Sequence, residues 1–347
     1  MYFLREFEKT LMDALKRHSN LIIVNTRIHR FLSYIPLEYG EERDPAPIFF
    51  HEEIQGILKS LTRVDLSRVF KKKKLGDTKL ELPVYKFMTD EQLQESLELS
   101  KKRAQEVLQM PPVVQVRKPI DRVYVEDRAL IGHNTNRMIF TDITFGVKDR
   151  NRLIVVRELD GMLRDANWKE RDRMNQIYFP KNKQKLKVPK MFEDKYLQDL
   201  LGRKEYEFIL NCACAQFEPD NEQYQKVTSL TYQHINDNNG FECLRSTRHF
   251  GPLIFYLSWF KNIDNLLLEL IETAHIVDAN RLLQLYKKIH ETDLNITDVQ
   301  SLDGIMDYVK QAAVNKSSLE LAVQAYIELV KQRKQLDEGI HVAHGLM

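Results

Sequence analysis

The sequence predicts a mainly α protein with a small antiparallel β-meander, an α+β chain that ends in a C-terminal array of antiparallel helix pairs. Three observations predict this class. Apolar and polar residues alternate with a period of two in a short stretch near the middle of the chain. Apolar residues recur every three or four positions over most of the rest. Past residue 190, periodic stretches of ten to twenty residues follow one another with short connections, as in helix pairs.

The charge is distributed unevenly along a chain that is nearly neutral as a whole. The 347 residues are 43% hydrophobic, which suffices for a core, and the net charge is +2. Residues 1–190 carry 37 basic and 27 acidic side chains, whereas residues 191–347 carry 15 and 23. The first part therefore suits a polyanion, and the second part suits neutral or basic surfaces.

Several classes of protein are disfavoured by what the sequence lacks. No run of eighteen apolar residues is present, so we expect no membrane span. The nucleotide-binding loops, the zinc-protease motif and the nucleophile elbow are also missing, so we expect no enzyme, no cofactor and no small-molecule substrate. Cys212, Cys214 and Cys243 are an odd number with unsuitable spacing for a metal site, and we expect buried helix cysteines in a reducing compartment.

Residues 1–45 form a possible organelle-targeting segment or an N-terminal extension. An apolar helical face backed by Lys16 and Arg17 favours targeting, whereas Glu6 and Asp13 suit an ordinary amphipathic helix equally well. Both interpretations stay open.

Residues 46–136 form an N-terminal helical and extended region. Apolar spacing predicts a helix over 50–61 and a longer one over 89–110, which Thr89 and Gln92 open as a capping box. The pattern over 117–132 is too weak to assign. Four consecutive cations lie between the two helices, and they are either phosphate contacts or part of a solvated loop: Lys71, Lys72, Lys73 and Lys74.

Residues 137–190 should form the β-meander with a supporting helix and a basic tail. Strands are predicted over 139–147, 152–159 and 162–164, with a tight turn at Asp160 and Gly161. A helix from Trp168 should begin at a capping pair of Asn167 and Glu170. Its side chains expected to pack on the sheet are Trp168, Met174, Ile177 and Tyr178.

The stretch 148–190 holds 13 Lys and Arg against 6 Asp and Glu, so it is the main candidate for RNA binding. In an extended tail alternate lysines share one face and could follow a phosphate strand, although a solvated loop is the alternative. Within the helix, Arg171 and Arg173 are expected to be balanced by Glu170 and Asp172. The candidate phosphate contacts are Lys148, Arg150, Arg152, Lys181, Lys183, Lys185 and Lys187.

Residues 191–347 should form a C-terminal helical domain, with one break near His275 and a last helix capped by Ser317 and Glu320. Arg245 and Arg248 form a basic island in this acidic part. They could hold a phosphate or an acidic partner, or could pair within the chain with Glu242 or another nearby carboxylate.

Several segments of the chain together form a recognisable signature. They include Ile154-Val155-Val156-Arg157-Glu158, Trp168-x-Glu170-Arg171-Asp172-Arg173-Met174, Gln176-x-Tyr178-Phe179-Pro180-Lys181, Ala215-Gln216-Phe217-Glu218-Pro219-Asp220 and Leu244-Arg245-Ser246-Thr247-Arg248. These segments closely resemble one family, small-subunit protein twenty-two of the mitochondrial ribosome. The resemblance is collinear over roughly residues 50–262, and it is weak outside them.

The resemblance implies a non-catalytic structural component of the mitochondrial small ribosomal subunit, in the mitochondrial matrix. Its partners would be the small-subunit ribosomal RNA and neighbouring small-subunit proteins. It also favours mitochondrial targeting for residues 1–45. The competing hypothesis is a free helical adaptor of the matrix that binds proteins only, with its lysines solvated.

Overall fold

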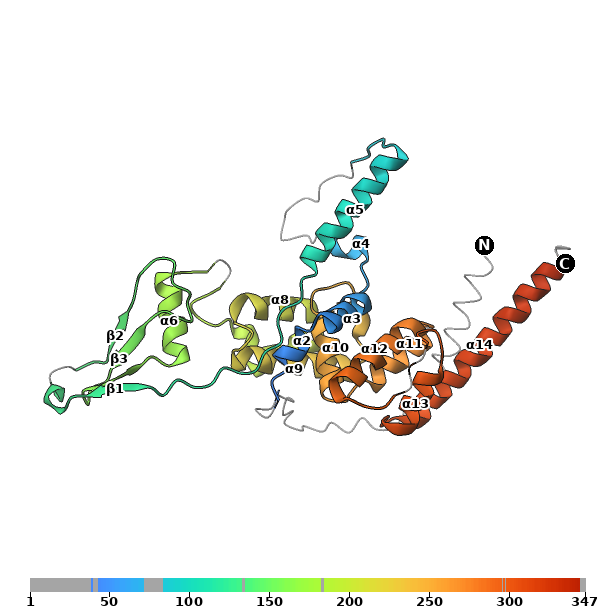
Figure 1. Ribbon diagram of the computed structural model, residues 1–347. Helices are drawn as coiled ribbons and strands as arrows, with labels where there is room; N and C mark the ends of the chain where they lie inside the picture. Colours follow the sequence, from blue (N-terminus) through green and yellow to red (C-terminus); the bar gives the residue numbers. More distant parts are fainter. Residues whose placement is uncertain are drawn as a thin grey trace. The chain divides into compact units, whose positions relative to one another are not determined.

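The computed structural model describes residues 39, 43–71, 84–132, 135–181, 184–294, 296 and 298–343. Lys72, Lys73, Lys74 and Lys183 lie outside the described residues, and so does almost all of the segment 1–45. The described chain is mainly α-helical with one small antiparallel sheet, which confirms the predicted fold class (Figure 1).

The first helices form around periodic apolar residues, as predicted. They are α2 (Ala46–Phe49), α3 (Glu52–Thr62), α4 (Leu66–Val69) and α5 (Asp90–Val107). Ile54, Leu58 and Leu61 bury one face of α3, which contacts α10 and α12 of the C-terminal helices. Thr89 caps α5, and the capping box with Gln92 is complete.

The sheet contains four strands in the order β1-β4-β3-β2, all antiparallel. They are β1 (Val123–Glu126), β2 (Met138–Thr141), β3 (Ile154–Arg157) and β4 (Met162–Asp165). The predicted meander is thus β2, β3 and β4. The first predicted strand is shorter than expected because the Asp142 carboxylate accepts bonds from the backbone and hydroxyl of Thr144, which turns the chain.

Strand β1 falls in the stretch where the sequence pattern was too weak to assign. All four of its residues are exposed, and its pairing with β4 is irregular between Val123 and Val125. An exposed strand on an edge needs no apolar alternation, so periodicity gave no signal for it. A short 3-10 turn, η1 (Arg128–Leu130), follows it.

Helix α6 (Trp168–Tyr178) covers one face of the sheet and begins at the predicted capping box of Asn167 and Glu170 (Figure 1). Ile154, Val156 and Ala166 form the small core beneath it, with Met174 packed against them. The packing face was predicted only in part: Ile177 and Tyr178 are exposed, whereas Arg171 and Asn175 are the buried residues of α6.

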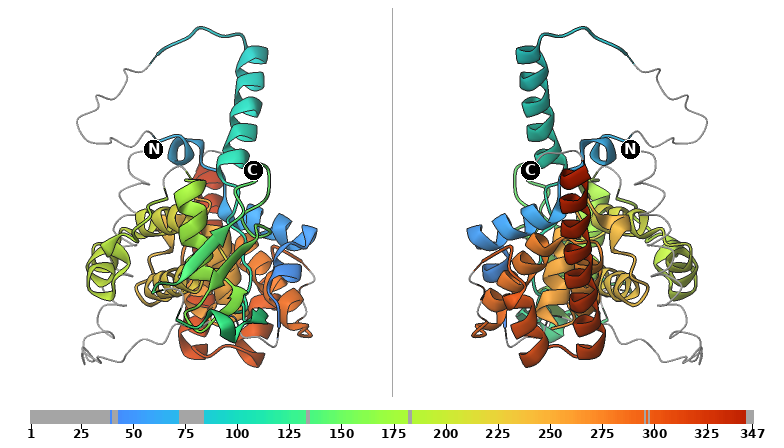
Figure 2. Two further views of the ribbon diagram at one scale, coloured as in Figure 1. Left: turned by 90° about the vertical axis from the view of Figure 1, so that its left-hand side faces the viewer. Right: turned by 90° about the vertical axis from the view of Figure 1, so that its right-hand side faces the viewer.

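The C-terminal part is a packed array of helices. Its large apolar core also includes residues of α2 and α3, so the core residues run in sequence from Phe49 to Val323. Figures 1 and 2 show α14 beside α11 and α13, which it contacts. The elements are η2 (Lys190–Phe192), α7 (Asp194–Gly202), α8 (Tyr206–Gln216), α9 (Glu222–Asp237), η3 (Phe241–Leu244), α10 (Phe250–Trp259), α11 (Asp264–Glu272), α12 (Ile276–His290), α13 (Asp303–Gln311) and α14 (Lys316–Ala343).

Of two predictions about helix ends in this part of the chain, one is confirmed and one is wrong. The predicted break near His275 is present, because Ala274 takes a left-handed conformation with a φ of 59° between α11 and α12. The predicted cap of the last helix is wrong: α14 begins at Lys316, so Ser317 lies inside it. The buried carboxylate of Asp264 instead accepts from the backbone amides of Val314 and Asn315 just before the helix.

Among the described residues, none of the helices combines the length and the apolar character that crossing a membrane requires. Within the same residues, no group of three or more His, Cys, Asp or Glu side chains is placed to hold a metal ion. Cys212 and Cys214 are half-buried on α8, while Cys243 is exposed, so only part of the expected cysteine burial is observed.

Candidate nucleic-acid interface

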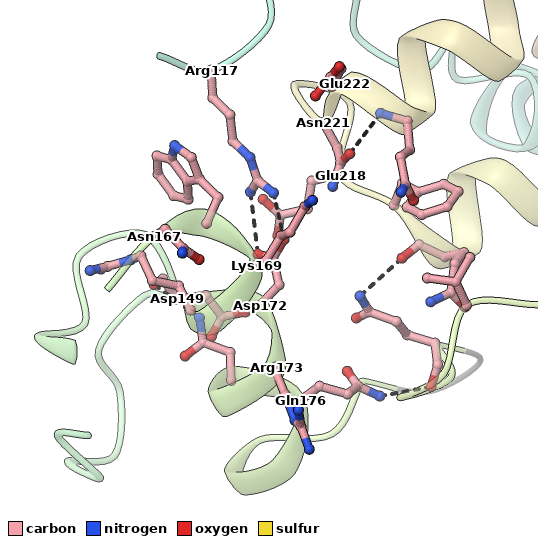
Figure 3. Close-up of a pocket in the computed structure, with 18 of the residues that line it drawn as sticks. Arg117, Asp149, Asn167, Lys169, Asp172, Arg173, Gln176, Glu218, Asn221 and Glu222 are labelled. Atoms are coloured by element: carbon pink, nitrogen blue, oxygen red, sulfur yellow. Dashed lines mark hydrogen bonds and ion pairs between the residues drawn. The ribbon is translucent and has the colours of Figure 1, made fainter. Parts of the chain in front are cut away.

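A groove of about 1290 Å³ separates α6 from the first C-terminal helices. Its walls are α6, the extended segment 116–121, the described residues of the basic tail (181 and 184–188), and the corner where α8 leads into α9. Figure 3 shows Arg117 reaching from the extended segment toward Asp172 on α6, with Glu218, Asn221 and Glu222 on the side of α8 and α9. The sequence predicted the basic tail, but not the groove.

Arg117 fixes one wall of the groove. Its Nη2 lies 2.5 Å from Oδ2 of Asp172, and its guanidinium stacks on the ring of Trp168 at 4.5 Å. Its backbone amide donates to the carbonyl of Asp220, next to the start of α9. Arg117 therefore connects α6 with the corner before α9, and its ion pair neutralises Asp172, which was expected to balance Arg171 and Arg173.

The basic tail is held against the end of α8 by its backbone. The side chain of Gln216 donates to the carbonyl of Lys185 at 2.8 Å and accepts from its amide at 3.1 Å. Gln184 donates to the carbonyl of Gln216 at 3.0 Å. The two bonds between Gln216 and Lys185 use main-chain atoms of the tail, so they do not occupy the ammonium group of Lys185, and both Lys185 and Lys187 are exposed.

Lys181 and Arg150 are paired within the chain. Nζ of Lys181 lies 2.8 Å from Asp149 and 2.9 Å from Glu218, while Arg150 pairs with Asp220 at 2.8 Å. Partial burial tends to lower the pKa of Lys181, but its hydrogen bonds to the two carboxylates outweigh burial and raise that pKa. Both cations are half-exposed, yet their charges are largely balanced.

Arg152 and Arg171 are buried and hold the backbone together. The guanidinium of Arg152, in a residue only 2% exposed, donates to the carbonyls of Asp142, Thr144 and Val147. Arg171 donates to the carbonyl of Arg152 at 2.5 Å. The structure contradicts the phosphate contact predicted for Arg152, because this buried side chain faces the inside of the sheet unit.

Arg164 is a further cation of the stretch 148–190 that is paired within the chain. It binds the carboxylates of Glu158 at 2.6 Å and Glu170 at 3.0 Å. The hydrogen bond from Arg164 lowers the pKa of Glu170 despite the opposing effect of partial burial. Glu170 is thus engaged by Arg164 and not by Arg171 or Arg173, contrary to expectation.

Four cations that line the groove make no ion pair with any described residue and are exposed: Lys169, Arg173, Lys185 and Lys187. Lys169 and Arg173 are four residues apart on α6, so they lie on the same side of that helix. Asp121 and Glu222 are the lining carboxylates for which no ion pair with a described residue is found. The groove therefore has a surplus of positive charge on two of its walls.

Sequence reasoning missed Lys169 and Arg173 as candidates. Their spacing of four residues in a predicted helix was a usable signal, because side chains so spaced share a face. Lys148 and Lys71 are also exposed, without an ion pair to the described part of the chain, but neither lines the groove. They remain separate candidates.

The two arginines of the basic island, Arg245 and Arg248, make their contacts within the chain. Arg245 is buried and pairs with Glu242 at 3.2 Å and Glu269 at 3.4 Å, and it stacks over the ring of Phe250. Arg248 is half-buried and donates to Asn211. For Arg245 the intramolecular alternative is the correct one. A phosphate role for Arg248 is also disfavoured by its place in the packed array.

Comparison with known proteins places this chain in the class of mitochondrial ribosomal proteins, because the family model that matches it describes such a protein. The model is that of "Mitochondrial 28S ribosomal protein S22", and it matches residues 47–291. Small ribosomal subunit protein mS22 of Mus musculus is 40% identical over 298 residues, which cover 84% of this chain and 82% of the mouse protein. The Bos taurus protein of the same name is 40% identical over 296 residues, with the same coverage.

The chain belongs to the mitochondrial 28S ribosomal protein S22 family. Membership confirms the resemblance seen in the sequence, and it implies a mitochondrial protein with a structural role in the ribosome. Both relatives carry the name of a ribosomal protein, so the free helical adaptor finds no support in them.

Proposed function

We propose that this protein is a structural constituent of the mitochondrial small ribosomal subunit, that it acts in the matrix, and that it catalyses no reaction of its own. Its basic groove would contact ribosomal RNA, and its acidic helical part would contact neighbouring ribosomal proteins. Family membership supports the ribosomal role. The four unpaired groove cations are the observation that supports the RNA contact.

The chemistry of the groove fits a phosphate backbone and not a base-specific site. The lysine and arginine side chains offer positive charge from two walls, α6 and the basic tail, to whatever strand lies between them. Binding of phosphates releases condensed counterions, so affinity should fall as salt rises. Each phosphate neutralised on single-stranded RNA contributes roughly 0.7 to the slope of log affinity against log salt.

The test replaces the four groove cations together: Lys169→Gln, Arg173→Gln, Lys185→Gln and Lys187→Gln. A matched control replaces three lysines and one arginine that are exposed on the last two helices: Lys310→Gln, Lys331→Gln, Arg333→Gln and Lys334→Gln. Each variant is expressed in mitochondria and its cosedimentation with small subunits is measured over a range of salt concentrations. Binding of the purified proteins to small-subunit RNA gives the salt slope.

We expect the groove variant to lose cosedimentation at raised salt and to lower the slope by about 3 units, four contacts at roughly 0.7 each. The control should behave as the unaltered chain. An equal loss of cosedimentation in both variants would mean that the groove cations act only through the overall charge of the protein. An unchanged slope in the groove variant would exclude the groove as the RNA contact while leaving family membership intact.

A further inference from the structure

The residues around the start of α5 carry an unusual amount of exposed apolar surface. Residues 84–99, which we call the α5 arm, comprise the extended segment before the helix and its first ten residues. Tyr85 and Phe87 in the extended segment have relative exposures of 90% and 107%, and Val84 is also largely exposed. Exposed apolar patches of this kind mark sites of protein interaction.

The helix continues this apolar surface as a stripe that is covered only at its far end. Leu93, Leu97 and Ala104 lie on one face of α5, because their spacing follows the helical repeat, and the C-cap residue Leu108 continues that spacing. Ala104 is fully buried, in the half of α5 that follows the arm. Leu93 and Leu97 are 50% and 44% exposed, so the same stripe is left uncovered along the arm.

In both views of Figure 2, α5 rises from the helices below it with no other described helix or strand alongside its first turns. Most helical stability in proteins comes from packing of an apolar face, and the ten residues of α5 in the arm lack such packing along Leu93 and Leu97. The uncovered stripe is therefore where a partner would supply that packing.

The charge of the arm selects the kind of partner. Asp90, Glu91, Glu95 and Glu98 are all exposed, and Lys86 is the only cation in residues 84–99, so the arm has a net charge of −3. RNA phosphates would be repelled by it. A protein that offers an apolar groove with lysine and arginine around it would be attracted.

We propose that the α5 arm binds in a groove of a basic protein that neighbours this chain, with the apolar stripe facing the groove. The inference rests on the proposed function only in that the neighbour would be another small-subunit protein. Tyr85, Phe87, Leu93 and Leu97 provide the apolar anchors, and the carboxylates of α5 orient the encounter. This surface is separate from the RNA-contacting groove beside α6.

Site-specific photocrosslinking in the full chain tests the proposal. p-Benzoylphenylalanine replaces Leu97, on the stripe, or Leu99, which lies about 200° around the same helix and is 61% exposed. Irradiation in intact mitochondria is followed by sedimentation, RNase treatment and sequencing of the crosslinked peptide. Crosslinking of the purified chain alone is measured in parallel.

We expect an RNase-resistant adduct at position 97, absent at 99, to a single protein whose crosslinked segment is rich in Lys and Arg. In that background Glu95→Lys with Glu98→Lys should lower the yield about tenfold, since charge complementarity is lost. A second measurement replaces Leu93 and Leu97 by Gln and captures the partner through a crosslinker at Tyr85, where about a tenfold loss for each leucine is expected.

Other outcomes overturn the proposal. An RNase-sensitive adduct would make the occupant RNA. An adduct in the purified chain, to a second copy or to the chain's own residues 72–83, would make the surface a self-contact. Equal adducts at positions 97 and 99, or none at either, would remove the stripe as a docking site. By contrast, a protein adduct that persists without cosedimentation with subunits would support the docking surface and refute only the ribosomal role.

Discussion

Replacing Arg152 by Met should destabilise the sheet unit without changing how the protein binds RNA. The side chain lies beneath the loop between β2 and β3, where it donates to the carbonyls of Asp142 at 2.8 Å, Thr144 at 3.0 Å and Val147 at 2.9 Å. Its guanidinium also lies 3.7 Å from the centre of the ring of Phe179. Methionine keeps the apolar stem but removes every donor.

The magnitude follows from these contacts. Hydrogen bonds to charged groups contribute roughly 1.5 to 3 kcal/mol each, but the loop that carries the three acceptors is partly exposed, so water would recover part of this. We take about 1 kcal/mol for each bond and about 1 kcal/mol for the stacking on Phe179. Burial of the methionine side chain should offset about 1 kcal/mol. The expected loss of unfolding free energy is therefore about 3 kcal/mol.

Urea unfolding followed by tryptophan fluorescence measures this loss. The chain has two tryptophans. Trp259→Phe would leave Trp168, at the start of α6, as the reporter of the sheet unit. Arg152→Lys is the matched control, because it retains the positive charge but cannot reproduce the planar fork of donors. We expect Arg152→Lys to lose about 2 kcal/mol as well.

Two results would refute this reasoning. A loss below about 0.5 kcal/mol for Arg152→Met would mean that the three hydrogen bonds contribute little to stability. Unchanged stability together with a salt slope reduced by roughly 0.7 would assign Arg152 to a phosphate, as the sequence first predicted. Full retention of both properties in Arg152→Lys would support the second interpretation.

Three further predictions concern other parts of the fold. Gly161→Ala should cost about 1 to 3 kcal/mol in urea unfolding, because φ is +85° and the new Cβ would lie 2.0 Å from the carbonyl oxygen of Asp127. Asp264→Ala should lower the free energy of unfolding by about 2 to 4 kcal/mol, since the Tyr308 hydroxyl and two backbone amides lose their acceptor; Asp264→Asn should recover part of this loss. Burial lowers the pKa of His234, so the unfolded chain takes up the proton first and stability should fall as pH drops below about 6.5; His234→Gln should flatten that pH dependence.

Local signals predicted the helices well. The capping boxes at Thr89 and Asn167 are both present, because such caps depend on residues three apart in sequence. The break near His275 and the tight turn at Gly161 are likewise short-range features. The last helix is the instructive exception: its start is set by Asp264, a carboxylate fifty residues earlier that no local pattern identifies.

The candidate site was predicted less well, because ion pairs join residues distant in sequence. Of the candidates predicted from the sequence, Lys185 and Lys187 line the groove without an ion pair to a described residue, whereas Lys181 and Arg150 pair with carboxylates near residues 218–220. Counting charges along the chain could not separate these two groups. Packing leaves four cations of the stretch 148–190 exposed and without an ion pair to a described residue along the groove, and Lys148 exposed outside it.

The sequence by itself determined the fold class, the two helix starts with capping boxes and the family, since periodicity, caps and segment similarity all act over short distances or along the whole chain. Only the tertiary structure decided which cations reach solvent. Arg152 and Arg173 look alike in sequence, but one lies beneath a loop with three carbonyls and the other lies at the open face of α6. The difference arises because a buried guanidinium must find acceptors, while an exposed one is left for a partner.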